Sequence, residues 1–375
     1  MEALILSCGT GGGHDSACLA MEQALSARGH SVKTLNPYLL KGERTAEMVN
    51  NAYNILAQKA PSAFGMVYRL GNAYRKLPLS SPVYYLNKHM VPYFAQFLRE
   101  NHFDLIVMTH LFPAEIITHM KRSGLQVPTT CFIATDYACT PFTEETDCDH
   151  YVIPAASLTD EFVSRGIPRE RILPLGIPVG RQFYEKIEKA EARRRLGLDL
   201  ETNYILIAGG SIGAGQIEQI VPMLLGHYGD AARLIVICGN NHSLYQHLER
   251  DYGERCILLG YTPRMAEYMC ACDLFLSKPG GLSSTEAAVT GTALIHITPI
   301  PGCETRNMVF FEKHGMCCAV NSPKKELLAA CDQLLEGSRR QRMLEHQQRE
   351  IPANAASAIC AFLEEEHRRA AIMAS

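Results

Sequence analysis

The sequence has no apolar run that approaches the roughly 18–20 residues needed to cross a bilayer. It has no Cys-x-x-Cys pair among its 14 cysteines and no basic leader typical of a signal peptide. We therefore expect a chain that does not cross a membrane. Because Cys131, Cys238, Cys256 and Cys318 lie inside apolar segments, we interpret the cysteines as small buried hydrophobes in a reducing cytoplasm.

Excess positive charge is absent too. A net charge of −3 gives no general attraction to nucleic acid, so no nucleic-acid partner is expected. The composition, with 47% apolar and 20% charged residues, is that of a globular protein, and 375 residues favour two domains over one.

Short apolar runs alternate with helix-like stretches along most of the chain. The predicted strands are 3–8, 32–36, 104–110, 129–135, 150–155 and 172–178 in the first half, and 204–210, 233–239, 256–261, 274–280, 293–298 and 317–320 in the second. The repeated β–α–β order predicts parallel sheets covered by helices. A polar linker at 185–202 separates the two series. We therefore expect an α/β fold of two Rossmann-like, doubly wound parallel-sheet domains that face a cleft.

The expected domains are residues 1–180 and 181–350, followed by a last helix within 351–375 that packs back on the first domain. The stretch after the first strand has helical spacing and predicts a helix that Gly29 ends.

A glycine cluster follows the first strand, with Gly9, Gly11, Gly12 and Gly13 directly before His14. The cluster matches neither a Walker A loop nor a G-x-G-x-x-G fingerprint, so no nicotinamide cofactor is implied. A tight turn in which His14 caps a helix would explain it. The functional alternative is that the glycines let a substrate reach His14, whose usual pKa near ~6.5 suits a general base.

Two more glycine clusters follow strands in the second half, GGSIGAG at 209–215 and KPGGLSSTEAAVTG at 278–291. Two helix N-termini in one domain are suited to the two phosphates of a nucleotide diphosphate without a metal. The structural alternative is that Ser283 or Ser284 is an N-cap and that Ser283-x-x-Glu286 is a capping box.

The pattern Asp147-Cys148-Asp149 resembles a divalent-metal motif, but it directly precedes a strand. We interpret it as a surface turn, and Cys148 and His150 are too few for a zinc site. No metal is expected.

Four segments together resemble one family. They are LSCGTGGGH near the N-terminus, ATDY at 134–137, GGSIGAG at 209–215 and SKPGGLSSTEAAVTGTALIHITPIPGCETRNMVFFEKHG at 277–315. The chain resembles the monogalactosyldiacylglycerol synthases and processive diacylglycerol glucosyltransferases of glycosyltransferase family 28. The resemblance implies the two-domain GT-B fold, with the acceptor on the N-terminal domain and the UDP-sugar on the C-terminal one.

The resemblance also implies roles for individual residues. His14 corresponds to the histidine that deprotonates the acceptor hydroxyl, and Gly12, Gly13 and Asp136 to the acceptor side. The positions implied to bind the UDP-sugar are Gly210, Ser211, Gly213, Gly280, Gly281, Leu282, Ser283, Glu286, Glu304 and Asn307. Among these, Glu286 would bind the ribose hydroxyls, and Glu304 and Asn307 would face the sugar.

Two departures from the family pattern concern specificity. Cys303 stands where the family usually has a glutamine, which removes a hydrogen bond expected to a sugar hydroxyl and leaves the hexose open. The histidine and tryptophan that follow Asp136 in well-known members are missing, and the chain has no tryptophan at all.

The segment 48–99 contains no acidic residue, but it contains six lysines and arginines interleaved with six tyrosines and three phenylalanines. This composition favours contact with an anionic membrane surface, where each cation contributes about 1 kcal/mol. Buried helices with solvated basic side chains are the structural alternative.

The resemblance implies an inverting glycosyltransferase that moves a hexose from a UDP-sugar to a diacylglycerol-type lipid and makes a β-glycosyl glycolipid. No cofactor is expected, and the location implied is cytoplasmic, at the face of the cytoplasmic membrane. The alternatives are a lipid-II-type N-acetylglucosaminyltransferase, a UDP-sugar epimerase, or a non-catalytic nucleotide-sugar-binding regulator.

Overall fold

The computed structural model describes residues 1–9, 11–59, 71, 74, 80–185, 187–210, 213 and 216–374, with the backbone alone for 52–59 and 374. The chain forms two compact units. Unit 1 comprises Met1–Gly180, Pro301–Cys303 and Asn354–Ser375, and unit 2 comprises Arg181–Ile300 and Glu304–Ala353.

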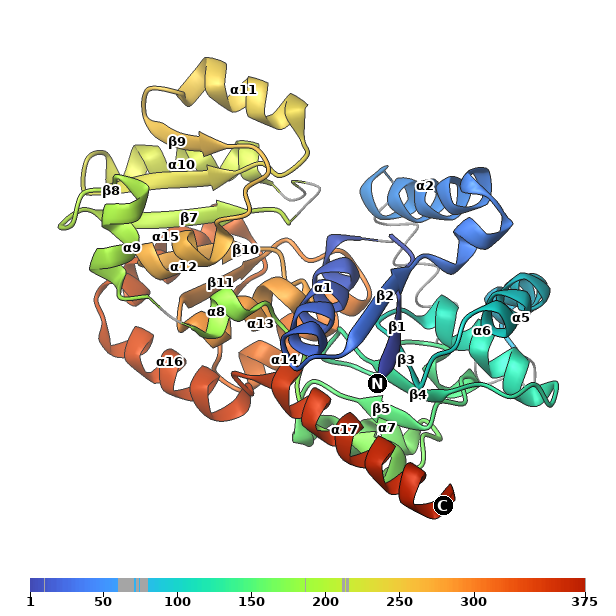
Figure 1. Ribbon diagram of the computed structural model, residues 1–375. Helices are drawn as coiled ribbons and strands as arrows, with labels where there is room; N and C mark the ends of the chain where they lie inside the picture. The colour runs from blue at the N-terminus through green and yellow to red at the C-terminus, as the bar shows by residue number, and fades with distance from the viewer. Residues whose placement is uncertain are drawn as a thin grey trace. The chain divides into compact units, whose positions relative to one another are not determined.

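Unit 1 contains a six-stranded parallel sheet in the order β2-β1-β3-β4-β5-β6 (Figure 1). Its strands are β1 (Glu2–Leu6), β2 (Ser31–Leu35), β3 (Leu105–Met108), β4 (Thr129–Ile133), β5 (His150–Val152) and β6 (Ile172–Leu173). After β2 the chain returns to the other side of β1, so the winding reverses between β1 and β3. Loops that leave these two strands diverge there and open a crevice at their carboxyl ends.

Helices surround this sheet. They are α1 (Gly12–Ala27), α2 (Glu43–Lys59), α4 (Pro82–Asn87), α5 (Val91–Glu100), α6 (Leu111–Arg122), α7 (Thr159–Ser164) and α17 (Ala355–Ala374), with single 3-10 turns η1 (Pro37–Lys41), η2 (Lys88–Met90), η3 (Thr143–Glu145), η4 (Ala156–Leu158) and η5 (Arg169–Arg171). One face of the sheet packs on α1 and α17, which lie side by side in Figure 1. Alternate strand residues such as Ala3 and Ile5 face Met21 of α1 and Ile359 of α17 in this core.

The predicted end of α1 at Gly29 is confirmed. Gly29 has φ +82°, and its N–H donates to the Ser26 carbonyl at 3.0 Å while the His30 N–H donates to the Leu25 carbonyl at 3.2 Å. This pair of bonds is a Schellman motif, which needs a left-handed residue at the position that Gly29 occupies.

Polar contacts also fix α17 to the end of α1. Glu364 accepts hydrogen bonds from Arg28 at 3.0 Å and from His30 at 2.8 Å. The predicted C-terminal helix is thus attached to unit 1 by an apolar face and by an ion-paired carboxylate.

Unit 2 contains a second parallel sheet, in the order β12-β11-β10-β7-β8-β9. Its strands are β7 (Asn203–Ala208), β8 (Ala232–Ile237), β9 (Cys256–Leu259), β10 (Leu274–Ser277), β11 (Ala293–Ile297) and β12 (Cys318–Val320). This is the strand order of dinucleotide-binding folds, and the winding reverses between β7 and β10. All twelve predicted strands are confirmed, as is the two-domain α/β fold class.

The helices of unit 2 form two layers. They are α8 (Arg181–Tyr184), α9 (Lys189–Leu196), α10 (Ile217–Tyr228), α11 (His242–Tyr252), α12 (Met265–Ala271), α13 (Gly281–Thr290), α14 (Cys303–Lys313), α15 (Pro323–Leu335) and α16 (Ser338–Glu350). The helices α10 and α15 contact each other in one layer, and α12, α13 and α16 form contacts in the other. Strands buried on both faces explain runs such as LIVM and LFLS, in which every residue is buried.

Replacing Glu364 by Gln should lower the melting temperature at pH 7 by roughly 1–3 °C, because such ion pairs contribute about 0.5–1 kcal/mol. The hydrogen bond from His30 and the charge of Arg28 hold the pKa of Glu364 below its usual range. The stabilisation by Glu364 is therefore fully present above the pKa that this carboxyl has in the unfolded chain. It is lost as the pH falls through the lower pKa of the folded protein, so the melting temperatures of variant and wild type should converge near pH ~3.

The matched control is Glu365→Gln, which removes the same charge from the same helix but breaks pairs with Arg368 and Arg369 inside α17. Equal losses in the two variants, measured by thermal denaturation across pH, would contradict a role of Glu364 in attaching α17.

Candidate active site

The first glycine turn lies at the reversal point of unit 1, between β1 and α1. Gly11 is the N-cap of α1 with φ 96°, and Gly12 and Gly13 are the first two helical residues. Gly9 has φ +64°, and a Cβ there would lie 2.9 Å from Asn50 Nδ2. The backbone conformation therefore favours glycine at this turn, whereas the Asn50 side chain could move aside.

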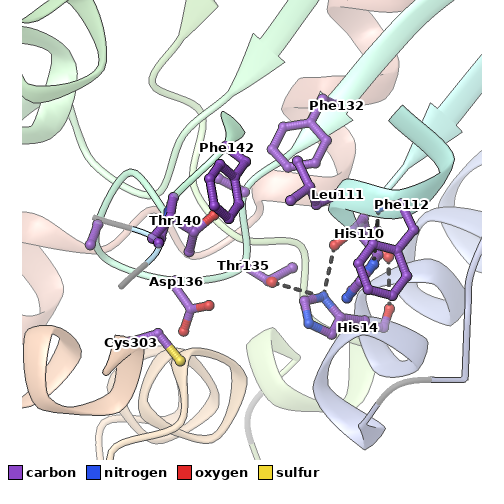
Figure 2. A pocket seen from close by; sticks show the side chains of 15 residues that line it. His14, His110, Leu111, Phe112, Phe132, Thr135, Asp136, Thr140, Phe142 and Cys303 are labelled. Atoms are coloured by element: carbon purple, nitrogen blue, oxygen red, sulfur yellow. Dashed lines mark hydrogen bonds between the residues drawn. The ribbon is translucent and has the colours of Figure 1, made fainter. Parts of the chain in front are cut away.

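His14 lies in the first turn of α1 but does not cap it, so the capping interpretation is wrong. Its Nδ1 lies 2.7 Å from the Thr109 carbonyl oxygen and 3.0 Å from the Thr135 hydroxyl (Figure 2). A carbonyl only accepts, so Nδ1 carries the proton and the lone pair of neutral His14 is on Nε2. Nε2 has no hydrogen-bond partner among the described residues. Residues at the ends of β3 and β4 thus hold His14 in the tautomer whose lone pair is on Nε2.

His110 packs edge-on against His14, with ring centroids 4.7 Å apart. It follows β3, and its Nδ1 accepts the Phe112 N–H at 3.2 Å, which caps α6. Burial, with a smaller contribution from His14, holds the pKa of His110 well below its usual range. His110 therefore stays neutral beside a His14 that has taken up a proton. His110 was not among the predicted site residues, although a histidine at the carboxyl end of a predicted strand was the available signal.

A cavity of about 200 Å³ opens beside the two histidines. Apolar side chains form most of its wall, namely Leu111, Phe112, Phe132, Ala134, Ala138, Pro141 and Phe142. Phe142 adopts a left-handed conformation with φ 73°, which costs energy for an aromatic residue and turns this ring into the wall. Asp136 and Cys303 also line the cavity, the latter from the short stretch 301–303 that packs with unit 1.

The glycines of unit 2 gather at its own reversal point, after β7 and β10. Gly210 has φ +72° and Gly213 has φ +57°. A Cβ on Gly213 would lie 2.3 Å from the Cys238 carbonyl oxygen at the end of β8, so only glycine fits. Ser211, the third residue proposed for this turn, lies outside the described residues.

The capping-box interpretation of Ser283 and Glu286 is wrong. Helix α13 starts at Gly281 with Gly280 as its N-cap, so Glu286 is beyond the first turn. The helix can begin earlier than expected because Gly280 accepts the Ser284 N–H at 3.0 Å and needs no side-chain cap. Leu282 and Ser283 are then first-turn residues, and capping no longer explains Glu286.

The carboxylate of Glu286 is partly buried and has no hydrogen-bond or ion-pair partner in the part of the chain that the structure describes. Burial raises its pKa to about 8. A partly buried carboxylate without protein donors is less stable than a fully solvated one. A carboxylate without protein donors is expected where a bound ligand supplies the hydrogen-bond donors.

Glu304 and Asn307, at the start of α14, have partners within unit 2. Glu304 forms an ion pair with Lys278 and accepts the Ile300 N–H at 2.8 Å. Asn307 donates to the Pro279 carbonyl at 3.0 Å. Lys278, directly after β10, was not among the predicted site residues, although the sequence shows it as the only charged residue in its glycine cluster before Glu286.

Two family models match the chain. Residues 14–179 match monogalactosyldiacylglycerol (MGDG) synthase, and residues 204–359 match the glycosyltransferase family 28 C-terminal domain. The chain belongs to glycosyltransferase family 28. The two matches confirm the family resemblance of the sequence, and the N-terminal match begins at His14.

Several curated relatives carry the name processive diacylglycerol beta-glucosyltransferase. The protein from Staphylococcus saprophyticus is 30% identical over 230 residues, which is 59% of this chain and 56% of that protein. The protein from Bacillus subtilis is 25% identical over 344 residues, 89% of this chain and 87% of that protein. The alignments with the first three relatives span only 54–62% of their lengths.

Solved structures share the fold. MurG from Acinetobacter baumannii is 16% identical with a TM-score of 0.61 over 97% of this chain and 99% of that one. Os79 from O. sativa, solved in complex with UDP, is 12% identical with a TM-score of 0.63 over 98% of this chain and 100% of that one. Both likenesses support the GT-B fold of this family.

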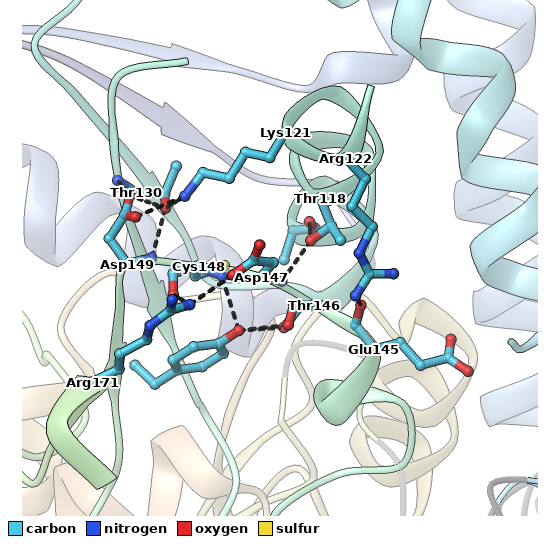
Figure 3. Close-up of polar contacts among 12 residues, drawn as sticks. Thr118, Lys121, Arg122, Thr130, Glu145, Thr146, Asp147, Cys148, Asp149 and Arg171 are labelled. Atoms are coloured by element: carbon cyan, nitrogen blue, oxygen red, sulfur yellow. Dashed lines mark hydrogen bonds and ion pairs between the residues drawn. The ribbon is translucent and has the colours of Figure 1, made fainter. Parts of the chain in front are cut away.

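The Asp147–Asp149 turn is partly exposed, with both aspartate side chains 42% exposed, and it is attached to unit 1 by polar contacts (Figure 3). Asp149 accepts the Thr130 N–H at 2.9 Å and pairs with Lys121 at 2.9 Å, and Asp147 pairs with Arg171 at 2.6 Å. These donors occupy both carboxylates. Within the described ranges no group of three His, Cys, Asp or Glu side chains is placed to hold a metal ion.

The acid-free segment is described only in part. Arg69, Arg75 and Lys76 lie outside the described residues. On α4, Tyr85 is 55% and Leu86 67% exposed, whereas other aromatic residues of the segment, such as Phe94, are fully buried. No helix in the described part of the chain has the length and apolar character needed to span a bilayer.

Replacing Glu286 by Gln should raise the melting temperature above pH 8 by about 2–5 °C. The raised pKa means that folded Glu286 binds its proton more tightly than unfolded Glu286 does, so wild-type stability falls as the pH rises from ~4.5 towards about 8. Glutamine cannot ionise and escapes this loss. Below pH ~4 the two proteins should melt together.

Glu267→Gln is the control, and its stability should change in the opposite direction, because the hydrogen bond from Arg264 lowers the pKa of Glu267. That variant should lose stability above pH ~5. A Glu286→Gln variant that melts below wild type at pH 8.5 would contradict the assignment of an unpartnered carboxylate.

Proposed function

We propose that this protein is an inverting glycosyltransferase that transfers a hexose from a UDP-sugar to the hydroxyl of a diacylglycerol-type lipid. The observation that carries the proposal is that His14 lines an apolar cavity and that its Nε2 has no hydrogen-bond partner in the described part of the chain. Family membership and the printed names of the relatives support the substrate classes.

The cavity suits a lipid alcohol better than a sugar acceptor. Its wall is built mainly from aromatic and aliphatic side chains, which would pack on the glycerol and the first acyl carbons. Gly12 and Gly13 leave the start of α1 without side chains. Asp136 adds one acidic group to the cavity wall, which would orient the acceptor. The hydroxyl to be activated would lie at the polar end, next to His14.

The donor would bind unit 2 at the ends of β7 and β10. The backbone N–H groups at the start of α13, after Gly280 and Gly281, suit a phosphate. The unpartnered Glu286 carboxylate would accept hydrogen bonds from the vicinal ribose hydroxyls. Glu304 and Asn307 would lie on the sugar side of this site.

The reaction is a single displacement. His14 Nε2 takes the proton of the lipid hydroxyl, the freed oxygen forms a bond to the anomeric carbon, and the bond from that carbon to the β-phosphate oxygen breaks with its electron pair staying on UDP. One displacement inverts the carbon, so an α-linked donor gives a β-glycoside. The Thr109 carbonyl then stabilises the imidazolium through Nδ1–H.

A product assay tests the function. The protein is incubated in liposomes with separate UDP-hexoses or UDP-N-acetylglucosamine, and with diacylglycerol or a lipid-linked muropeptide as acceptor, and the products are identified by mass spectrometry. A monohexosyl or oligohexosyl diacylglycerol supports the proposal. Transfer of N-acetylglucosamine to a lipid-linked muropeptide, epimerised UDP-sugar without transfer, or UDP-sugar binding without turnover would each replace it by the corresponding alternative.

His14→Ala should lower turnover by about 10²–10⁴-fold, because the base is lost, while the affinity for UDP stays within twofold of wild type. Turnover is measured on liposomes and UDP affinity by calorimetry. His102→Ala, at an exposed position of unit 1 outside segment 48–99, is the control and should keep full turnover. A His14→Ala variant that retains a tenth of wild-type turnover would shift the role of base to Asp136.

The lipid would be reached through the acid-free segment 48–99. Exposed Tyr85 and Leu86 precede the exposed Lys88, and Lys41 of η1 lies over the Tyr93 ring at 5.9 Å. Tyrosines beside lysines are typical of surfaces that contact anionic lipid headgroups. Among the described residues, these are the ones that support a lipid-contacting surface in this segment.

Changing Lys41 and Lys88 to Glu should weaken binding to anionic vesicles by about 2 kcal/mol or more, at about 1 kcal/mol per cation. Wild-type binding should also fall steeply towards ~0.5 M salt, because the Debye length shortens to a few ångströms. Vesicle sedimentation gives both results. The charge-matched control in unit 2, with Lys313 and Lys324 changed to Glu, should bind like wild type. Equal losses in the two variants would mean that only overall charge matters.

A further inference from the structure

Lys278 is the first residue after β10, so it lies at the reversal point of unit 2. Its side chain runs between the two glycine turns of the candidate donor site. A Cβ on Gly210 would lie 3.1 Å from Lys278 Cε and 3.9 Å from its Nζ, and one on Gly280 would lie 3.8 Å from Nζ. The ammonium group is therefore close to the backbone of both turns at once.

Glu304 holds this ammonium in place. Its Oε1 pairs with Lys278 Nζ, and its Oε2 accepts the Ile300 N–H at 2.8 Å. Both side chains are largely buried, at 16% and 8% exposure. The Pro279 carbonyl between Lys278 and Gly280 is fixed by Asn307 Nδ2 at 3.0 Å. The charge of Lys278 thus has a fixed position, set by contacts from α14.

A diphosphate needs more than the backbone of the two turns can supply. Oriented N–H groups at a helix N-terminus amount to about half a positive charge, whereas a nucleoside diphosphate carries at least two negative charges. The breaking glycosyl bond adds one more to the β-phosphate. A fixed cation within reach of both turns would stabilise that charge where it develops.

We propose that Lys278 binds the diphosphate of the donor and of the leaving nucleotide, and that Glu304 positions it between the turns at Gly210 and Gly280. This assignment rests on the proposed function of unit 2 as the nucleotide-sugar site. Lys278 supplies the full positive charge at the leaving group. Glu304 acts through Lys278, because both of its oxygens already have partners.

The test compares UDP and uridine binding by calorimetry. Lys278→Met should weaken UDP binding by about 10-fold or more, the usual loss for a charged hydrogen bond, and leave uridine binding within twofold. Because Lys278→Met alone leaves the Oε1 of Glu304 buried without its ion-pair partner, the loss of UDP affinity in that variant has two explanations. The double variant Lys278→Met/Glu304→Gln removes both charges, and neutral replacement of a buried pair is tolerated. It therefore distinguishes a lost contact with the diphosphate from the effect of an unpaired Glu304.

If Lys278 contacts the diphosphate, the double variant still binds UDP at least about 5-fold more weakly than wild type, with unchanged uridine binding. Recovery of wild-type UDP affinity in the double variant would overturn the inference and make Lys278 a partner of Glu304 only. Lys313→Met, on the same helix as Glu304 but exposed, is the charge-matched control. A wild-type protein that binds neither UDP nor uridine would overturn the proposed function itself.

Discussion

Parallel strands that are buried on both faces can present chemistry only at their ends, and this constraint organises the whole protein. The strands β1, β3, β7 and β10 are almost entirely apolar and covered by helices. Each continues at its carboxyl end into a short polar or glycine-rich segment. Because the winding of each sheet reverses between two of these strands, the segments diverge and leave room for a ligand at those points.

The two reversal points differ in their chemistry. In unit 1, a backbone carbonyl fixes the tautomer of His14, and a second, neutral imidazole packs against it in an apolar cavity. In unit 2, the charged side chains are held close to glycine turns with little side-chain bulk. The first arrangement suits proton transfer from an apolar alcohol, and the second suits a highly charged ligand with hydroxyls.

Energetically unfavourable features gather at these same points. Phe142 has a left-handed backbone in the cavity wall, and Thr298 has φ 43° directly before a proline, just beyond β11. Glu286 keeps a carboxylate without donors among the described residues. By contrast, Asp147, Asp149 and Glu364, which are charged residues away from the two points, all have ion-pair partners. Backbone strain at Phe142 and the unpartnered carboxylate of Glu286 therefore mark the candidate sites more clearly than residue type alone does.

The sequence by itself determined the strands, the glycine turns and the family, because apolar runs, glycines and local motifs are read from neighbouring residues. It placed His14 in the first turn of a helix for the same reason. It misassigned Ser283 and Glu286 to a capping box, since the start of α13 depends on the conformation of Gly280. Only the tertiary structure could join Thr109 and Thr135 to His14, or Lys278 to Glu304, because these contacts link residues 26 to 121 positions apart. Such distances in sequence are closed by sheet order, and sheet order leaves no local pattern.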